Sequence, residues 1–166
     1  MTLSQLNANH IRSEDRLLLR ISTSQDEEYR LWLTRLVTGE LIADCSERLL
    51  RSLAPGLPPA VAAALSGFRQ DAMQGALQAG GFQPARRLPL GTEPQLVTSC
   101  AIEHSGGQYT LKLLLPQGRE LGLPLGEGQL RKLLLLLDRI QQQAGWGLKA
   151  SAPPAAAPEA SARTLH

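Results

Sequence analysis

The chain has 166 residues, of which 43% are apolar and 19% are charged, and its formal net charge is +2. This composition fits one folded domain with a moderate core and excludes a wholly disordered chain. The charge is too balanced to create a strong positive field, so it gives no special support to binding of nucleic acid or of an anionic membrane.

Three features concern the cellular compartment. Residues 1–10 contain neither the basic nor the apolar segment of a secretory signal. The longest unbroken leucine run, residues 133–137, is too short to cross a bilayer. Cys45 and Cys100 lie far apart in unrelated predicted elements, so reduced thiols are expected rather than a disulfide. We therefore expect a cytoplasmic protein that does not enter a membrane.

The first structured region, residues 10–33, has the pattern strand, turn, strand, loop, strand. Apolar and polar side chains alternate in the second and third strands, and the apolar ones predict a single buried face: Leu17, Leu19 and Ile21, then Tyr29, Leu31 and Leu33. A one-residue slip would expose one set to water, which restricts the register. Either allowed pairing places Arg20 opposite Trp32 or diagonal to it.

Two helices and a loop are predicted next. An apolar stripe at helical spacing predicts a helix over 36–53, which Pro55-Gly56 ends. Pro58-Pro59 begins a second helix, over 59–78, and Gly80-Gly81 terminates it. The proline-containing stretch 82–94 is predicted to be a connecting loop.

The region after residue 94 has clear turn signals. Gly106-Gly107 predicts a two-residue hairpin that pairs Ile102 with Leu111, and Pro116-Gln117-Gly118 predicts a three-residue hairpin that pairs Leu111 with Leu123. The apolar side chains of all three strands then share one face. A final helix is predicted over 127–144, and the Ala/Pro-rich tail 149–166 is expected to be disordered.

The two ends of the chain resemble each other. His10 and His104 each stand seven residues before the first leucine of an alternating strand, Leu17 and Leu111, and a helical pattern follows each region. We therefore predict a single α+β domain over 1–148, built as two related β-β-β-α halves. The halves are about residues 4–54 and 94–146, with the connecting helix and loop over 55–93.

No motif for chemistry accompanies this pattern. The matched histidines could converge across a pseudo-twofold axis, but the chain lacks the ligand spacings of a metal site, so half-buried histidines at strand ends are favoured. Cys45 and Cys100 occupy apolar faces and are predicted to be inert. The carboxylates of 14–15 and 26–28 are interpreted as solvated loop charge. We predict no catalytic, cofactor-binding or metal-binding residue, and an enzyme is disfavoured.

The polar sheet face carries a candidate interaction surface, which is defined by Arg16, Arg20, Arg30, Trp32 and Arg35. Arginines around an exposed aromatic ring can bind nucleic acid by stacking on bases. The favoured interpretation is a cross-strand stack of Arg20 on Trp32 that stabilises the hairpin.

The last predicted helix carries a candidate oligomer contact. Leu135 and Leu136 lie off its apolar stripe and would form an apolar patch prone to association if both were exposed to water. Burial in a twofold dimer and burial under the helix 59–78 of the same chain are both open.

Residues 14–21 and 29–35 resemble segments of small bacterial proteins of unknown function, and Pro89-Leu90-Gly91 and the closing residues 144–148 are similar to the same family. The resemblance covers about residues 5–148 and implies no activity and no site. We expect a non-catalytic interaction protein that self-associates or binds another protein. The alternative is a nucleic-acid-binding module that uses the Arg/Trp sheet face.

Overall fold

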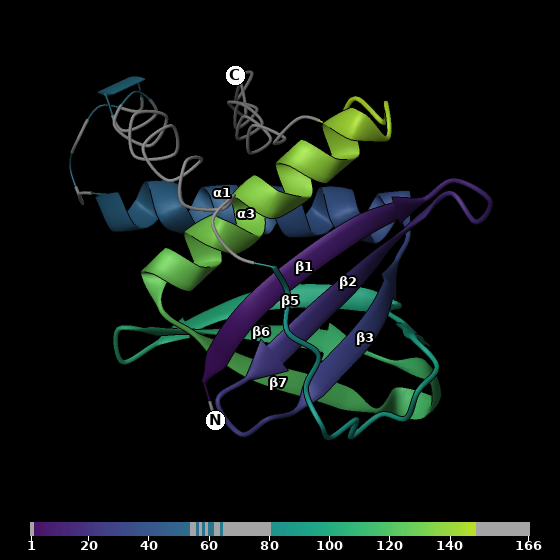
Figure 1. Cartoon of the computed structure of the whole chain (residues 1–166). Helices are drawn as coiled ribbons and strands as arrows, with labels where there is room; N and C mark the ends of the chain where they lie inside the picture. The colour runs from purple at the N-terminus through teal and green to yellow at the C-terminus, as the bar shows by residue number, and fades with distance from the viewer. Residues whose placement is uncertain are drawn as a thin grey trace, which may run out of the picture.

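The structure is a computed structural model that describes residues 2–53, 56, 58, 60, 61, 64 and 81–148. This part of the chain forms an α+β fold, as predicted, and contains two sheets and two helices (Figure 1). The elements are β1 (Leu3–Ile11), β2 (Arg16–Thr23), β3 (Glu28–Leu33), α1 (Arg35–Leu53), β4 (Gln95–Leu96), β5 (Ser99–Ser105), β6 (Gln108–Leu114), the 3-10 turn η2 (Pro116–Gly118), β7 (Glu120–Leu125) and α3 (Glu127–Gln143).

The first sheet has the strand order β1-β2-β3-β4. The first three strands are antiparallel, and the short β4 adds to β3 in parallel. Leu19 pairs with Leu31 and Ile21 with Tyr29, so the apolar sets of β2 and β3 meet on the buried face. The alternation in the sequence thus restricts the register, because a one-residue slip would expose one of these sets.

The second sheet is the antiparallel meander β5-β6-β7. Ile102 pairs with Leu111 and Leu111 with Leu123, which confirms both predicted hairpins. Gly106 and Gly107 have φ values of 58° and 79°, the left-handed conformation that a two-residue hairpin requires of both residues. Gly118 has φ 72°, as expected for the last residue of the three-residue turn.

One buried core joins both sheets and both helices. The helices α1 and α3 cross each other on one side of the molecule, and the two sheets lie beneath them (Figure 1). In this arrangement α3 packs along β1, and α1 packs on β5. The fully buried side chains come mainly from the alternating positions, among them Leu17, Leu19, Leu31, Leu111, Leu113 and Leu123.

The predicted boundaries differ from the structure at two places. The Leu-Val segment after Pro94 does not begin the second sheet, because residues 95–96 form β4 of the first sheet and β5 starts at Ser99. The strand β1 begins at Leu3, so it is much longer than the predicted first strand, which was recognised only at His10-Ile11. The expected helix 59–78, apart from residues 60, 61 and 64, and the expected disordered tail lie outside the described residues.

None of the helices in the described ranges is both long enough and apolar enough to span a bilayer.

Candidate functional site

The predicted interaction surface lies on the outer face of the first sheet, but its members do not form one platform. Arg20 pairs with Arg30 and Leu18 with Trp32, so Trp32 is diagonal to Arg20, one of the two pairings expected. Arg16 lies at the hairpin end of the same face, where its guanidinium is 3.8 Å from Glu14. Arg35 begins α1 instead, and its guanidinium donates a hydrogen bond to the backbone carbonyl of Trp146.

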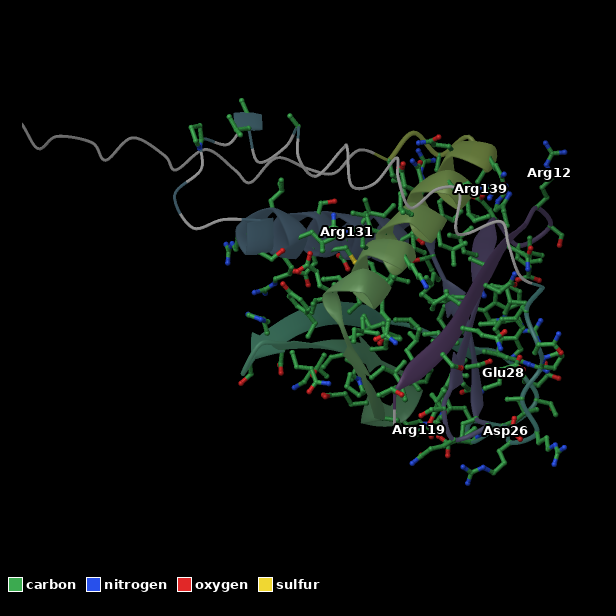
Figure 2. The ribbon with its side chains drawn as sticks, turned by 60° about the vertical axis from the view of Figure 1, so that its left-hand side comes forward. Arg12, Asp26, Glu28, Arg119, Arg131 and Arg139 are labelled. Atoms are coloured by element: carbon green, nitrogen blue, oxygen red, sulfur yellow. The ribbon has the colours of Figure 1, made fainter. Side chains whose placement is uncertain are left out.

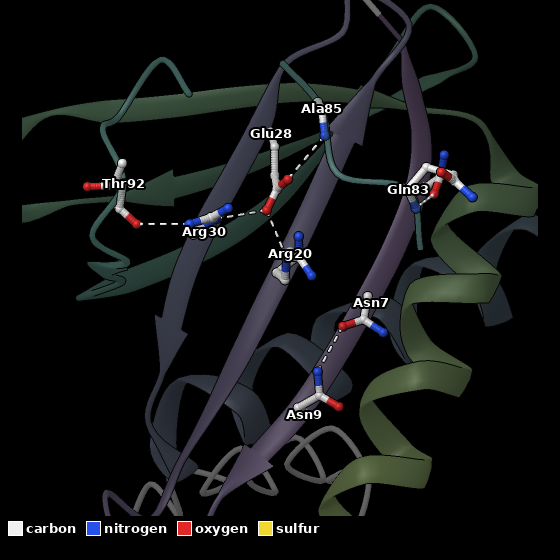
Figure 3. Close-up of polar contacts among 9 residues, drawn as sticks. Asn7, Asn9, Arg20, Glu28, Arg30, Gln83, Ala85 and Thr92 are labelled. Carbon is white, nitrogen blue, oxygen red and sulfur yellow. Dashed lines mark hydrogen bonds and ion pairs between the residues drawn. The ribbon is translucent and has the colours of Figure 1, made fainter. Parts of the chain in front are cut away.

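A buried carboxylate holds the two central arginines. The Nε atoms of Arg20 and Arg30 each donate to Oε1 of Glu28 over 2.8 Å, and the backbone N–H of Ala85 donates to Oε2 (Figure 3). The Glu28 side chain is 0% exposed. Burial alone would raise its pKa, but the hydrogen bonds from Arg20, Arg30 and Ala85 outweigh burial and lower it. The prediction that Glu28 is solvated loop charge is therefore wrong, since Glu28 is the first residue of β3 and its side chain is buried on the outer face of the sheet, under the chain at Ala85.

The segment 81–94 covers this face of the sheet. The guanidinium of Arg20 lies over the ring of Phe82, 4.2 Å from its centroid, and Arg30 donates to the backbone carbonyl of Thr92. The ring that stacks on Arg20 is therefore Phe82, which the sequence places in a loop, and not Trp32. The face that was expected to be open is closed by this loop and neutralised at Glu28.

The matched histidines occupy equivalent hairpin positions but do not converge. His10 pairs with Leu17 and His104 with Tyr109, in each case one pair before the hairpin closes. The two hairpin tips lie at opposite ends of the molecule (Figure 1). The His10 ring contacts Trp146 edge-on and its Nε2 is 3.3 Å from Asp15, whereas His104 stacks on Tyr109.

The two cysteines lie between α1 and β5. Cys45 is fully buried, and burial raises the pKa of its thiol well above the ordinary value. Cys100 is partly buried, and burial followed by the charges of Glu40 and Asp44 raises the pKa of its thiol to about 12. Both thiols are thus protonated at neutral pH, as expected of inert cysteines. Within the described ranges, no cluster of histidine, cysteine and carboxylate side chains could hold a metal ion.

A groove that the sequence did not indicate runs along the outer edge of β1, beside α3. Its volume is about 610 Å³, and we call it the β1–α3 groove. The strand β1 forms one wall, the helix α3 forms the other, and Phe82 closes part of it. The lining residues are Leu3, Ser4, Gln5, Leu6, Asn7, Ala8, Asn9, Phe82, Gln129, Lys132, Leu136, Arg139, Ile140 and Gln143.

The β1 wall presents an unpaired strand edge. The sheet order places β1 at the edge, with β2 on one side only. Across the described part of the chain, no backbone–backbone hydrogen bond other than those to β2 reaches residues 4–10, although the backbone N–H of Gln83 donates to the side-chain Oε1 of Gln5. Gln129 of α3 donates to the carbonyl of Leu3 at the beginning of the strand, and Asn7 and Asn9 bond to each other through their side chains (Figure 3). An antiparallel strand exposes every second pair of N–H and C=O groups at such an edge.

The α3 wall carries two cations that have no partner among the described residues. Lys132, Leu136, Arg139 and Gln143 follow one another at helical spacing and share one face of α3. Within the part of the chain that the structure describes, neither Lys132 nor Arg139 has a hydrogen bond or an ion pair. No described residue that lines the groove is acidic. Arg139 points outward from the C-terminal half of α3, away from Asp26 and Glu28 (Figure 2).

The leucines of the candidate oligomer contact do not form an exposed pair. Leu135 is 4% exposed, so it is already covered within a single chain. Leu136 is half-buried and lines the β1–α3 groove. The covering of Leu135 by the expected helix 59–78 falls outside the described residues.

Comparisons of the chain with models of protein families, with curated proteins and with solved structures found no match. The functional argument therefore depends on the geometry of this chain alone.

Proposed function

We propose that this protein is a non-catalytic interaction protein and that it binds an extended segment of a partner protein in the β1–α3 groove. The unpaired edge of β1 beside a groove of about 610 Å³ is the observation that supports this most directly. An extended segment would add to the first sheet as a further strand, with main-chain hydrogen bonds supplying affinity. On the α3 side, the groove would contact every second side chain of the bound segment.

Two properties favour this site over the Arg/Trp sheet face. Among the described residues, Lys132 and Arg139 on the groove wall have no hydrogen-bond or ion-pair partner, whereas Arg20 and Arg30 are held by Glu28. The β1 edge offers backbone donors and acceptors, which a strand needs and which bases in a nucleic acid do not need. The nucleic-acid-binding module therefore stays the alternative, with Trp32 as its half-exposed ring.

Further parts of the proposal concern the protein's architecture and origin. We infer that the two β-β-β-α halves are related as a repeat, which the common strand order of β1-β2-β3 and β5-β6-β7 and the equivalent positions of His10 and His104 support. Membership in the family of small bacterial proteins and a cytoplasmic location remain proposals. Two unpaired thiols, one buried and one partly buried, support the cytoplasmic location because free thiols persist in a reducing compartment.

Amide hydrogen exchange on the full chain tests the binding site. Peptides selected from a random library displayed on phage would be added to the protein, and the exchange of residues 4–10 would be compared with and without each one. We expect slowed exchange in β1, because newly bonded amides exchange only when the added strand leaves. Peptides that bind but protect only other segments would overturn the proposed site.

Self-association is checked in the same samples by sedimentation. Leu135 is buried, so a dimer would have to use another surface. A dimer whose β1 amides are already protected without peptide would replace the partner-protein proposal with pairing of two copies through β1.

A further inference from the structure

We propose that the β1–α3 groove selects acidic extended segments, with Lys132 and Arg139 as the residues that read the acidic side chains. This inference rests on the proposed function and adds the chemistry of the partner. The two cations have no ion-pair partner within the described residues, and the groove they line holds no described carboxylate. A segment bearing carboxylates would supply the missing countercharge.

The spacing of the cations suits an extended strand. Lys132 and Arg139 are seven residues apart on α3, which corresponds to about 10 Å along a helix axis. The same length spans about three residues of a strand, and side chains on one face of a strand repeat every second residue. Both charged groups are at the ends of long, flexible side chains. They can therefore reach glutamates that are two or four positions apart on an added strand.

The rest of the wall fits the other requirements of such a segment. Leu136 lies on the helix between the two cations, Ile140 directly follows Arg139, and together they give the groove an apolar floor. Gln143 beyond them is exposed and uncharged, so it neither repels nor neutralises a carboxylate. The groove thus alternates apolar and cationic positions along its length, which matches a segment in which glutamate recurs among apolar and polar residues.

The charge argues against a second copy in the same groove. Two copies that paired through β1 about a twofold axis would bring both sets of Lys132 and Arg139 to one seam. Like charges brought together in this way oppose association. An acidic partner segment in the groove would instead face cations of opposite charge.

The test uses three synthetic peptides that differ only in charge. The first is Thr-Glu-Val-Glu-Val-Glu-Thr, and the other two carry glutamine or lysine in place of every glutamate. Affinity is measured by fluorescence anisotropy at low and at physiological salt, and the exchange of β1 amides is followed with each peptide. We expect the acidic peptide to bind several-fold more tightly than the glutamine peptide and the lysine peptide to bind least, with the preference weakening as salt rises.

Variants of the full chain assign the effect to the groove. Lys132→Glu/Arg139→Glu should reverse the order, so that the lysine peptide binds more tightly than the acidic one. The matched control Arg51→Glu/Arg86→Glu changes the net charge by the same amount at exposed sites on α1 and on the loop over the first sheet. The control should retain the wild-type order. Circular dichroism and the unfolding midpoint confirm that both variants fold.

The outcomes separate the two proposals. Equal binding of the acidic and glutamine peptides, with protection of β1, overturns the acidic preference and leaves the proposed function standing. Absence of β1 protection with every peptide overturns the proposed function itself. Tighter binding of a single-stranded oligothymidine than of the acidic peptide, abolished by Lys132→Glu/Arg139→Glu, would identify the groove as a nucleic-acid site instead. Protection, in the free protein, of the β1 amides that do not bond to β2 would mean that a second copy or the chain's own residues already fill the groove, and would also overturn the inference.

Discussion

Asp15 accepts a hydrogen bond from the indole Nε1 of Trp146 over 2.8 Å, although the two residues are 131 positions apart in the chain. Asp15 lies in the turn between β1 and β2, and Trp146 follows the end of α3. Trp146 is buried, and its ring also meets His10 edge-on. This contact fastens the hairpin tip of the first sheet to the segment that follows the last helix.

The first prediction concerns the pH dependence of that contact. Hydrogen bonds from Trp146 and then from His10 hold the pKa of Asp15 below its ordinary value of 3.8. A carboxyl whose pKa is depressed by folding stabilises the fold above its unfolded pKa, and the stabilisation is lost as the pH falls through the folded value. We expect Trp146→Phe to raise the pKa of Asp15 towards 3.8, so the stability gap between wild type and variant should narrow as the pH falls below 3.8.

Urea unfolding over a pH series measures this gap, and an NMR titration of the Asp15 carboxyl measures the pKa directly. The control is Trp146→Phe placed in an Asp15→Asn background, where the gap should not depend on Asp15 titration. A gap of constant size at every pH in the wild-type background would contradict the assignment.

The second prediction concerns the buried carboxylate of the first sheet. Glu28→Gln removes the negative charge that Arg20 and Arg30 share and leaves two neighbouring guanidinium groups without a countercharge. Loss of one partner of such a buried pair costs about 3 kcal/mol of unfolding free energy. The control Glu47→Gln breaks an exposed ion pair with Arg51 and should cost at most about 0.5 kcal/mol.

Guanidinium unfolding would compare these two variants. The pKa of Glu28 lies below its ordinary 4.5, so the wild-type advantage should persist down to pH values below 4.5 and disappear only in stronger acid. Equal losses for Glu28→Gln and Glu47→Gln would show that Glu28 does not organise the arginines.

The third prediction concerns the aromatic partner of Arg20. Phe82 lies under its guanidinium, whereas Trp32 is diagonal to Arg20 in the sheet. Double-mutant cycles with Arg20→Met should give a coupling of about 0.5–1 kcal/mol with Phe82→Ala. The cycle with Trp32→Ala should give a much smaller coupling. A larger coupling with Trp32 would restore the Arg20–Trp32 stack expected from the strand pattern.

The fourth prediction concerns Cys100. The pKa of its thiol is raised to about 12, from an ordinary value of 9.0, so the unfolded chain loses this proton at lower pH than the folded chain. Its contribution to stability is complete below pH 9.0 and declines as the pH rises towards about 12. Cys100→Ala should therefore flatten the alkaline limb of the stability profile. Ellman's reagent at about pH 8 should label the native thiols slowly and the urea-unfolded thiols at once.

The sequence predicts this fold well where two signals agree. In the second sheet the glycine turns and the alternation of Ile102, Leu111 and Leu123 point to one register, and the structure has that register. In β2 and β3 the alternation excludes a one-residue slip, and the structure has one of the two pairings that bury both apolar sets. These contacts are local or are set by burial, which a sequence pattern records directly.

The candidate site could not be predicted because it depends on distant segments and on absent pairings. In β1 the alternation of apolar and polar residues is weak and depends on Leu6 and Ala8. The helix α3 lies beside this strand only through tertiary packing. Glu28 was misassigned because an acidic run next to a turn is usually solvated. Its spacing of two from Arg30 was the available signal that it belongs to the strand and shares the face of that arginine.

The parallel strand β4 has a consequence for synthesis on the ribosome. The backbone N–H of Glu28 donates to the carbonyl of Arg87, and the N–H of Val97 donates to that of Trp32, so the outer edge of β3 is closed by residues far downstream. The opposite strand, β1, receives α3 only when residues 127–143 have emerged. A nascent chain that stops at residue 54 therefore has three strands and one helix, and the outer edges of both β1 and β3 are uncovered. The packing of β1, which is synthesised first, is complete only after the last helix has been synthesised.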